Sequence, residues 1–142
     1  MKSKLLNISE ATTLAIHAMR YLSMTGERLS AAKLAGILCV SAHHLSKVMR
    51  RLVVAGLVSV GKGPEGGFYL TEKQNETTLM KIYKAIEGDA DFDVCLMNFP
   101  FCKKKHCIFG DTLKKIKKEF VDCLENTKIS YDTFIKETTK TN

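Results

Sequence analysis

The chain has 142 residues, 45% of them hydrophobic, which is enough for one domain with its own core. No stretch approaches the roughly 18 consecutive apolar residues of a membrane-spanning helix, and the first residues lack the apolar run of a signal peptide. We therefore expect a cytoplasmic protein with no membrane partner. In that compartment, five cysteines indicate metal binding or redox chemistry before disulfides.

The net charge of +7 is unevenly distributed along the chain. Residues 1–73 hold ten Lys and Arg against four acids, and residues 102–118 hold seven lysines against one aspartate. Clustered positive charge is typical of proteins that bind a polyanion, most simply nucleic acid.

The first predicted helix lies between Ser9, a plausible N-cap, and Gly26, where the pattern stops. Its apolar residues recur at helical spacing and predict one buried face. They are Ile8, Leu14, Ala15, Ala18, Met19 and Leu22.

Two further helices are predicted after Ser30 and Ser41, joined by a brief turn at Cys39 and Val40. The second of these ends at Gly56 and turns Leu45, Val48, Met49 and Leu52 inward. Two short helices, a tight turn and a polar outer face predict a helix-turn-helix, and an ordinary helical hairpin with a solvated basic face is the alternative. The candidate DNA-binding residues on the second helix are Ser41, His43, His44, Lys47, Arg50 and Arg51.

A β-hairpin is predicted next, with strands at Leu57–Val60 and Phe68–Leu70 around the turn "GKGPEGG". A basic, glycine-rich hairpin directly after a recognition helix is typical of a wing. We expect Lys62 to contact phosphate, and the glycines to let the backbone approach phosphates closely. These candidate residues are Lys62, Gly63, Gly66 and Gly67.

The segments "AAKLAGILCVSAHHLSKVMRRLVVAGLV", "GPEGGFYL" and "AIEGD" resemble the bacterial Rrf-type regulators, a family of winged-helix repressors that includes IscR, NsrR and CymR. The resemblance runs from about Leu5 to Phe120. It implies a mainly α fold with a small β-wing: a winged helix-turn-helix domain plus a long C-terminal dimerisation helix. Cys39 departs from the family, which usually has glycine in this turn, and we interpret it as a structural residue.

This interpretation divides the chain into four parts. Residues 1–80 form the DNA-binding domain, and residues 81–110 form a connector and cysteine-rich sensing loop. Residues 111–132 form the dimerisation helix and residues 133–142 a flexible tail.

The segment "CLMNFPFCKKKHC" places Cys95, Cys102 and Cys107 at C-x6-C-x4-C spacing. Close, irregular cysteine spacing recurs in iron–sulfur and zinc sites, and three thiolates can meet in such a loop. The resemblance implies an iron–sulfur cluster, [2Fe-2S] or [4Fe-4S]. Zinc with His106 as fourth ligand, and a thiol switch without a cofactor, are the alternatives. The candidate fourth ligands of a cluster are His106 or, from across a dimer, Glu10, His17 or Thr13.

The segment "DTLKKIKKEFVDCLENT" predicts a long helix with a narrow apolar seam flanked by charge. The helix either packs against its own domain or dimerises, and the resemblance favours dimerisation. Cys123 on this helix is expected to be a small core residue. The seam comprises Leu113, Ile116, Phe120, Cys123 or Leu124, and Thr127.

We therefore expect a homodimeric transcriptional regulator, in the role of a repressor, that binds a double-stranded DNA operator. Its cysteine loop would sense iron, redox or nitric oxide status. A cluster-free regulator of the same fold, using thiol or small-molecule sensing, is the alternative. An enzyme with a nucleophilic cysteine is disfavoured, because adjacent His106 and Cys107 offer no plausible base geometry.

Overall fold

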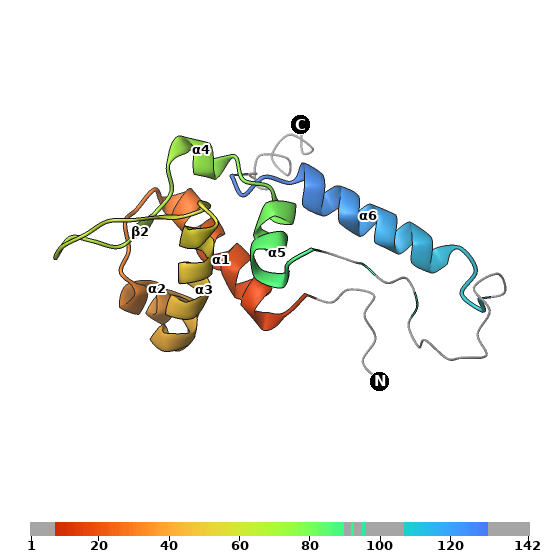
Figure 1. The fold of residues 1–142 in the computed structure, drawn as a ribbon, viewed down its shortest axis with the longest axis horizontal. Helices are drawn as coiled ribbons and strands as arrows, with labels where there is room; N and C mark the ends of the chain where they lie inside the picture. Colours follow the sequence, from red (N-terminus) through yellow and green to blue (C-terminus); the bar gives the residue numbers. More distant parts are fainter. Residues whose placement is uncertain (1–7, 90–91, 93–94, 96–106, 131–142) are drawn as a thin grey trace, which may run out of the picture.

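The computed structural model describes residues 8–89, 92, 95 and 107–130. The described chain is mainly helical, with a two-stranded antiparallel sheet (Figure 1). The fold class expected from the sequence is confirmed. The elements are α1 (Glu10–Thr25), α2 (Ala31–Leu38), α3 (Ala42–Val54), β1 (Ser59–Val60), β2 (Phe68–Tyr69), α4 (Glu72–Asn75), α5 (Leu79–Glu87) and α6 (Thr112–Asn126).

The first three helices begin where the sequence predicts. The side chains of Ser9, Ser30 and Ser41 each accept a hydrogen bond from the backbone N–H three residues further on. Each bond satisfies one of the amides that a helix start leaves without an intrahelical partner. Gly26, with φ +65°, ends α1 in the left-handed conformation that glycine adopts without steric cost.

The main core lies where α1, α2, α3 and α5 meet, and it includes Met19, Leu45 and Ile82, all fully buried. On α3 the residues buried are the four that the pattern predicts to face inward. The sequence did not predict α5. The domain boundary expected at residue 80 falls inside this helix, whose Ile82 and Ile86 belong to the same core as the buried residues of α3.

The wing is built on the register Ser59↔Tyr69 and Val60↔Phe68. A third segment joins it, because the N–H of Leu29 donates to the carbonyl of Phe68 at 3.0 Å and the N–H of Phe68 donates to the carbonyl of Leu29 at 2.8 Å. The strands are shorter than the sequence predicts. Leu57 is withdrawn from the hairpin because its N–H donates back to Leu52 in the last turn of α3.

Two wing glycines are required by close backbone packing. A Cβ on Gly67 would lie 2.6 Å from the backbone carbon and oxygen of Leu29, and one on Gly66 would lie 2.7 Å from the carbonyl oxygen of Gly61. Contacts this short with backbone atoms exclude a side chain at either position. Gly63 differs, because it has φ +87° and open space around it.

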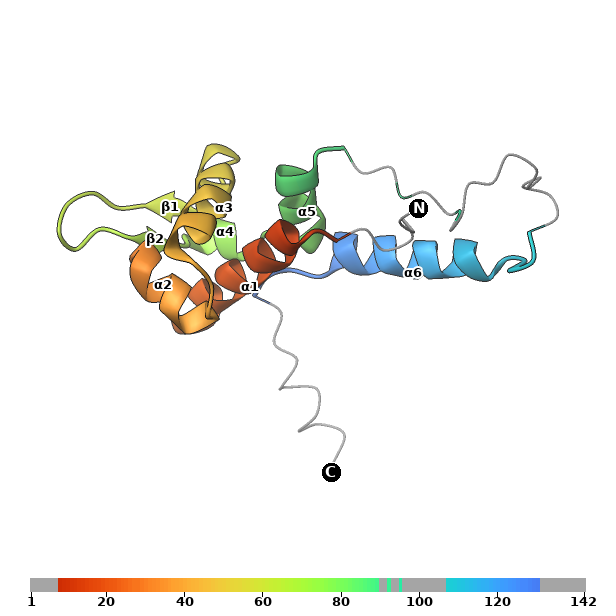
Figure 2. The same cartoon turned by 90° about the horizontal axis from the view of Figure 1, so that it is seen from below.

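Helix α6 leaves the body and projects beyond the end of α5 (Figures 1 and 2). Its C-terminal half packs on α5 through Leu124, in a second small core with Met80, Tyr83 and Phe92. Phe92 stacks between Tyr83 and Phe120, at centroid distances of 5.0 and 5.7 Å. None of the described helices is long and apolar enough to cross a membrane.

The chain reaches the body along α6 and continues into it after the helix. The helix ends at Asn126, six residues before the expected limit of 132, because Thr127 accepts a bond from the N–H of Leu79 and Ile129 donates to the carbonyl of Thr77. Arg20 also donates to the carbonyl of Ile129, whose side chain enters the main core.

The expected seam of α6 is only partly buried within one chain. Leu113 and Leu124 are buried, whereas Ile116 is 37% exposed. The expectation that Cys123 is a core residue is wrong for the single chain: its thiol is exposed beside the hydroxyl of Thr127, on a face that α5 does not cover.

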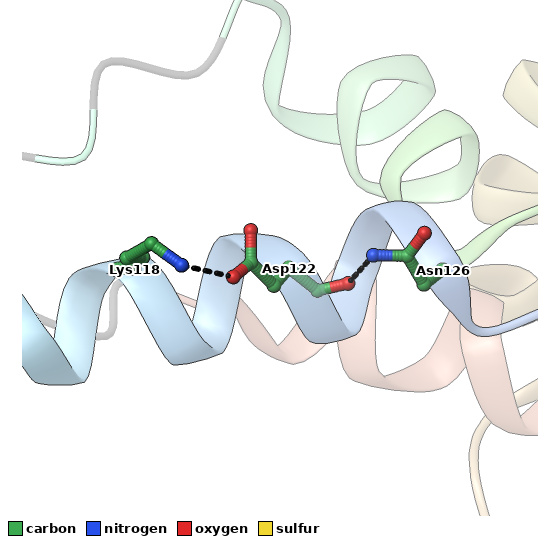
Figure 3. A network of polar contacts seen from close by, with 3 residues as sticks. All are labelled: Lys118, Asp122 and Asn126. Carbon is green, nitrogen blue, oxygen red and sulfur yellow. Dashed lines mark hydrogen bonds and ion pairs between the residues drawn. The ribbon is translucent and has the colours of Figure 1, made fainter.

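A polar row runs along another side of α6 (Figure 3). The Lys118 ammonium lies 3.0 Å from the Asp122 carboxylate, and the Asn126 amide donates to the Asp122 carbonyl at 2.8 Å. Such i,i+4 pairs support a helix that projects from the body.

Candidate nucleic-acid interface and cysteine segment

The outer face of α3 carries His43, Lys47 and Arg50, all exposed. None of these three side chains forms an ion pair with a described residue. The helix contains no acidic residue. Since Leu45, Val48, Met49 and Leu52 anchor the opposite face, the basic side chains are fixed in direction on a rigid helix.

His44 and Arg51, also predicted to contact DNA, are placed differently. His44 is half-buried, and its Nε2 is enclosed without a hydrogen-bond partner among the described residues. Arg51 reaches from α3 toward the end of α5 and donates a short hydrogen bond to the carbonyl of Ile86.

The turn before α3 is left-handed at Cys39, with φ +56° and ψ +41°. Cys39 has the only positive φ of a described residue other than glycine. Such a conformation costs a non-glycine residue of order 1 kcal/mol. The Val40 N–H donates to Ala35 at 3.0 Å, so the tight turn is kept despite this strain. The exposed thiol is 3.8 Å from the carbonyl oxygen of Gly36.

The wing presents Lys62, exposed at the start of the glycine-rich turn. Gly63 has open space around it, so its backbone is accessible. The absence of a side chain at Gly66 and Gly67 is explained by the close backbone packing of the wing. The sequence suggests a different reason, which is the close approach of the backbone to DNA phosphates.

Glu87 forms a polar junction at the end of α5, which the sequence did not predict. Its Oε1 accepts bonds from the N–H of Ser9, at 3.1 Å, and from the buried hydroxyl of Thr12. Burial raises the pKa of the Glu87 carboxyl, but the hydrogen bonds from Ser9 and Thr12 and the charge of Arg51 outweigh burial, so this pKa lies below its ordinary value. Burial, followed by the charge of Glu87, raises the pKa of the Tyr83 hydroxyl.

The cysteine segment is described at Cys95 and Cys107, both half-buried. Cys102 and His106 lie outside the described residues. Phe92, three positions before Cys95, is held between α5 and α6 by Tyr83 and Phe120. Phe92 therefore fixes where the segment leaves the body.

The three α1 candidates for a fourth ligand share the exposed face of that helix. The hydroxyl of Thr13 bonds to the carbonyl of Ser9 at 3.2 Å, whereas Glu10 lies exposed in the first turn. The Nδ1 of His17 lies 2.7 Å from the carbonyl of Thr13. A carbonyl only accepts, so this contact places the ring proton on Nδ1 and leaves the lone pair of Nε2 available.

Comparison with known proteins identifies the family of the chain. The Rrf2 family, described as an iron-dependent transcriptional regulator, matches residues 8–131. The chain belongs to the Rrf2 family.

Two curated relatives carry names of HTH-type transcriptional regulators. YwgB of Bacillus subtilis (strain 168) is 30% identical over 111 residues, which are 77% of this chain and 68% of that protein. A regulator from Aquifex aeolicus (strain VF5) is 26% identical over 125 residues, 85% of this chain and 87% of that one. This Rrf2-family chain is therefore a transcriptional regulator and not an enzyme.

Solved structures share the fold. CymR (YrzC), the global cysteine regulator of B. subtilis, is 21% identical with a TM-score of 0.67, over 87% of this chain and 93% of that chain. IscR of T. potens is 20% identical with a TM-score of 0.65, over 96% and 91% of the two chains. This Rrf2-family regulator therefore shares its overall fold with both solved structures.

The lowered pKa of Glu87 predicts a specific pH dependence of stability. A carboxyl with a lowered folded-state pKa stabilises the fold above its unfolded value, about 4.3, and this contribution disappears as the pH falls through the folded value. Glu87→Gln should lower the free energy of unfolding at pH 7 by about 1 kcal/mol, the scale of one hydrogen bond to a partly exposed charge. Near pH 3 it should have little effect.

Urea unfolding from pH 3 to 8 measures this difference. Glu125→Gln, at an exposed position on α6, is the matched control and should follow the wild-type curve. Parallel curves for Glu87→Gln and wild type would show that the junction carries no charge-dependent stability.

Proposed function

We propose that this Rrf2-family regulator acts as a homodimeric repressor of operators in double-stranded DNA. Its signal would be redox, iron or nitric oxide status, sensed through an iron–sulfur cluster held by Cys95, Cys102 and Cys107. The observation that carries the DNA-binding part is the acid-free basic face of α3, exposed opposite a fully packed core face.

The proposed DNA contacts fall into two groups. Ser41, His43 and Lys47 lie on the first turns of α3, the part of a recognition helix that meets base edges. Arg50, Lys62 and the backbone of the wing would contact phosphates. We assign Arg51 to the α3–α5 junction instead, because its guanidinium is already bonded to Ile86.

The cysteine chemistry supports a cluster. Thiolates are the ligands that iron–sulfur clusters use, and half-buried Cys95 and Cys107 combine shelter from water with access for a small signal. A bound cluster supplies a centre whose charge and integrity change with oxidant, iron or nitric oxide. Cys39 and Cys123, both exposed and on other elements, are not part of this proposed site.

Among the α1 candidates, His17 is the side chain best prepared to complete the site. Metal-bound histidines commonly donate their other ring N–H to a backbone carbonyl, which fixes the tautomer, and His17 makes this contact to Thr13. Thr13 is a poor ligand whose hydroxyl is engaged with Ser9. A histidine on α1 would serve the cluster of the partner subunit.

A second candidate function is cluster-free thiol sensing. The observation that favours it is the likeness in fold to CymR, the global cysteine regulator of B. subtilis. In this case the same three cysteines would respond through oxidation. Zinc held by these cysteines and His106 is the remaining alternative.

The exposed part of α6 supports the homodimer. Ile108, Phe109 and Ile116 are large apolar side chains left exposed at or just before its N-terminal half. They lie toward the N-terminal end of the helix, and the helical repeat of about 100° per residue places Ile116 on a different side from Lys118 and Asp122. An apolar group of this kind on a projecting helix fits a second copy of the chain.

Lys47→Ala should weaken binding to a duplex enriched from a random-sequence pool by about 1–3 kcal/mol if Lys47 reads a base. Fluorescence anisotropy on enriched and scrambled duplexes measures the effect. Lys81→Ala, which removes an equal charge from the exposed side of α5, should bind normally. An equal loss on both duplexes would assign Lys47 to phosphate, and no loss on either would contradict the proposed interface.

Cys95→Ala, Cys102→Ala and Cys107→Ala should each abolish visible absorbance, bound iron and acid-labile sulfide in protein purified without air. Each variant should also hold operator binding in one common, signal-independent state. Cys39→Ala and Cys123→Ala are the matched controls and should retain the colour. His17→Ala should shift the visible bands and speed bleaching in air, whereas Glu10→Gln should not.

A colourless wild-type protein with one zinc per chain would overturn the cluster in favour of zinc. A colourless, metal-free protein whose loop thiols oxidise reversibly would establish the thiol-sensing alternative.

Ile116→Asp should convert the dimer into folded monomers, since it places a charge in the proposed interface at a position exposed in one chain. Light scattering gives the mass and circular dichroism tests the fold. Lys115→Asp, about 100° around the helix, is the control and should remain dimeric. A dimeric Ile116→Asp protein would exclude this face of α6. Phe120→Asp is less informative, because Phe120 also packs on Phe92.

A further inference from the structure

Arg28 lies at the base of the wing in a fixed position. Its neighbour Leu29 pairs with Phe68 through two backbone hydrogen bonds, so the chain at Arg28 is held against the sheet. The guanidinium carbon of Arg28 lies 4.2 Å from the ring centroid of Tyr69 on β2. Arg28 is nevertheless exposed to solvent.

Gly61 provides the space for this guanidinium. A Cβ at Gly61 would lie 2.7 Å from Nη1 of Arg28, so the planar group rests where a side chain would otherwise be. Lys62 follows directly in the chain. Two positive side chains are thus gathered where the wing joins the helix-turn-helix.

The contact with the Tyr69 ring is a cation–π contact and takes up none of the N–H donors of the guanidinium in a hydrogen bond. Among the described residues, Arg28 has no ion pair with an acid and no hydrogen-bond acceptor for these donors. An arginine presents its N–H groups as a planar fork, which fits the oxygens of a phosphate. A purely structural role for Arg28 would need only its contact with the ring of Tyr69. The N–H groups that remain without an acceptor among the described residues also fit the binding of an anion.

The positive end of α2 adds to this charge. Ser30, its N-cap, lies two residues after Arg28, and the helix dipole favours an anion near the first turn. The stacked arginine, the adjacent lysine and the helix start therefore place positive potential at the junction of wing and helix-turn-helix.

We propose that Arg28, held over the ring of Tyr69, is a DNA phosphate contact of the wing base. This inference rests on the proposed function, because it requires the wing to meet DNA. It adds a phosphate-binding residue outside both the recognition helix and the glycine-rich turn.

The test compares Arg28→Gln with wild-type protein on the enriched and scrambled duplexes over a salt series. Each phosphate contact contributes about 0.9 to the slope of log K against log salt. We expect Arg28→Gln to bind both duplexes about three- to tenfold more weakly, with the slope reduced by about one per bound subunit. Lys81→Gln, with the same loss of charge on α5, should change neither quantity.

A double-mutant cycle tests the role of the ring. Tyr69→Leu should weaken binding in the wild-type background but not in Arg28→Gln, because the ring acts by positioning the guanidinium. Additive losses would overturn this positioning role.

The remaining outcomes distinguish failure of the Arg28 phosphate contact from failure of the proposed DNA-binding function. An unchanged salt slope in Arg28→Gln, with or without a lower melting temperature, would overturn the phosphate contact and leave Arg28 as a brace at most. A much larger loss on the enriched duplex would assign it to a base edge instead. If wild-type protein binds neither duplex at low salt, the proposed DNA-binding function itself fails.

Discussion

The last turn of α5 holds the recognition helix from behind. Ile86 and Glu87 are consecutive residues of this turn. The carbonyl of Ile86 accepts a hydrogen bond from Arg51 of α3, and the carboxylate of Glu87 accepts hydrogen bonds from Ser9 and Thr12 at the start of α1. The buried hydroxyl of Thr12 donates to Glu87 there, so α1 and α3 meet at one polar junction beside an apolar core. The direction of the basic face of α3 depends on this junction.

The same junction is where the chain departs toward the cysteines. Gly88, with φ +83°, ends α5, and Phe92 is then fixed between Tyr83 and Phe120. The other end of the segment enters α6, whose exit at Thr127 pairs with the start of α5. In the proposed regulator, a change in the cysteine segment therefore acts on both ends of α5. The coupling needed for regulation, typically 1–3 kcal/mol, is similar in size to a few such contacts.

The sequence predicted the features that follow from local chemistry. Three serine caps and the inward residues of α3 follow from capping and periodicity, and both are confirmed. Features that depend on distant partners were not predicted. The nine residues of α5 do not indicate that Glu87 accepts a hydrogen bond from Ser9, which lies 78 positions away in the sequence.

Two positions show what residue spacing leaves open. Cys123 has the spacing of a core residue, but α5 covers only part of α6. Arg51 has the charge of a DNA contact, yet it faces α5. Periodicity shows which residues share a face, and only the packing shows what covers that face.

The wing glycines show where the interface obtains its rigidity. Gly66 and Gly67 allow backbones to meet, and the Leu29 pairing joins the wing to the residue before the Ser30 cap of α2. Wing and helix-turn-helix thus form one unit without a flexible connection. A surface fixed in this way loses little conformational entropy on binding. The backbone that carries its cations is therefore already in place, and Arg28 over Tyr69 is a cation whose side chain is also held.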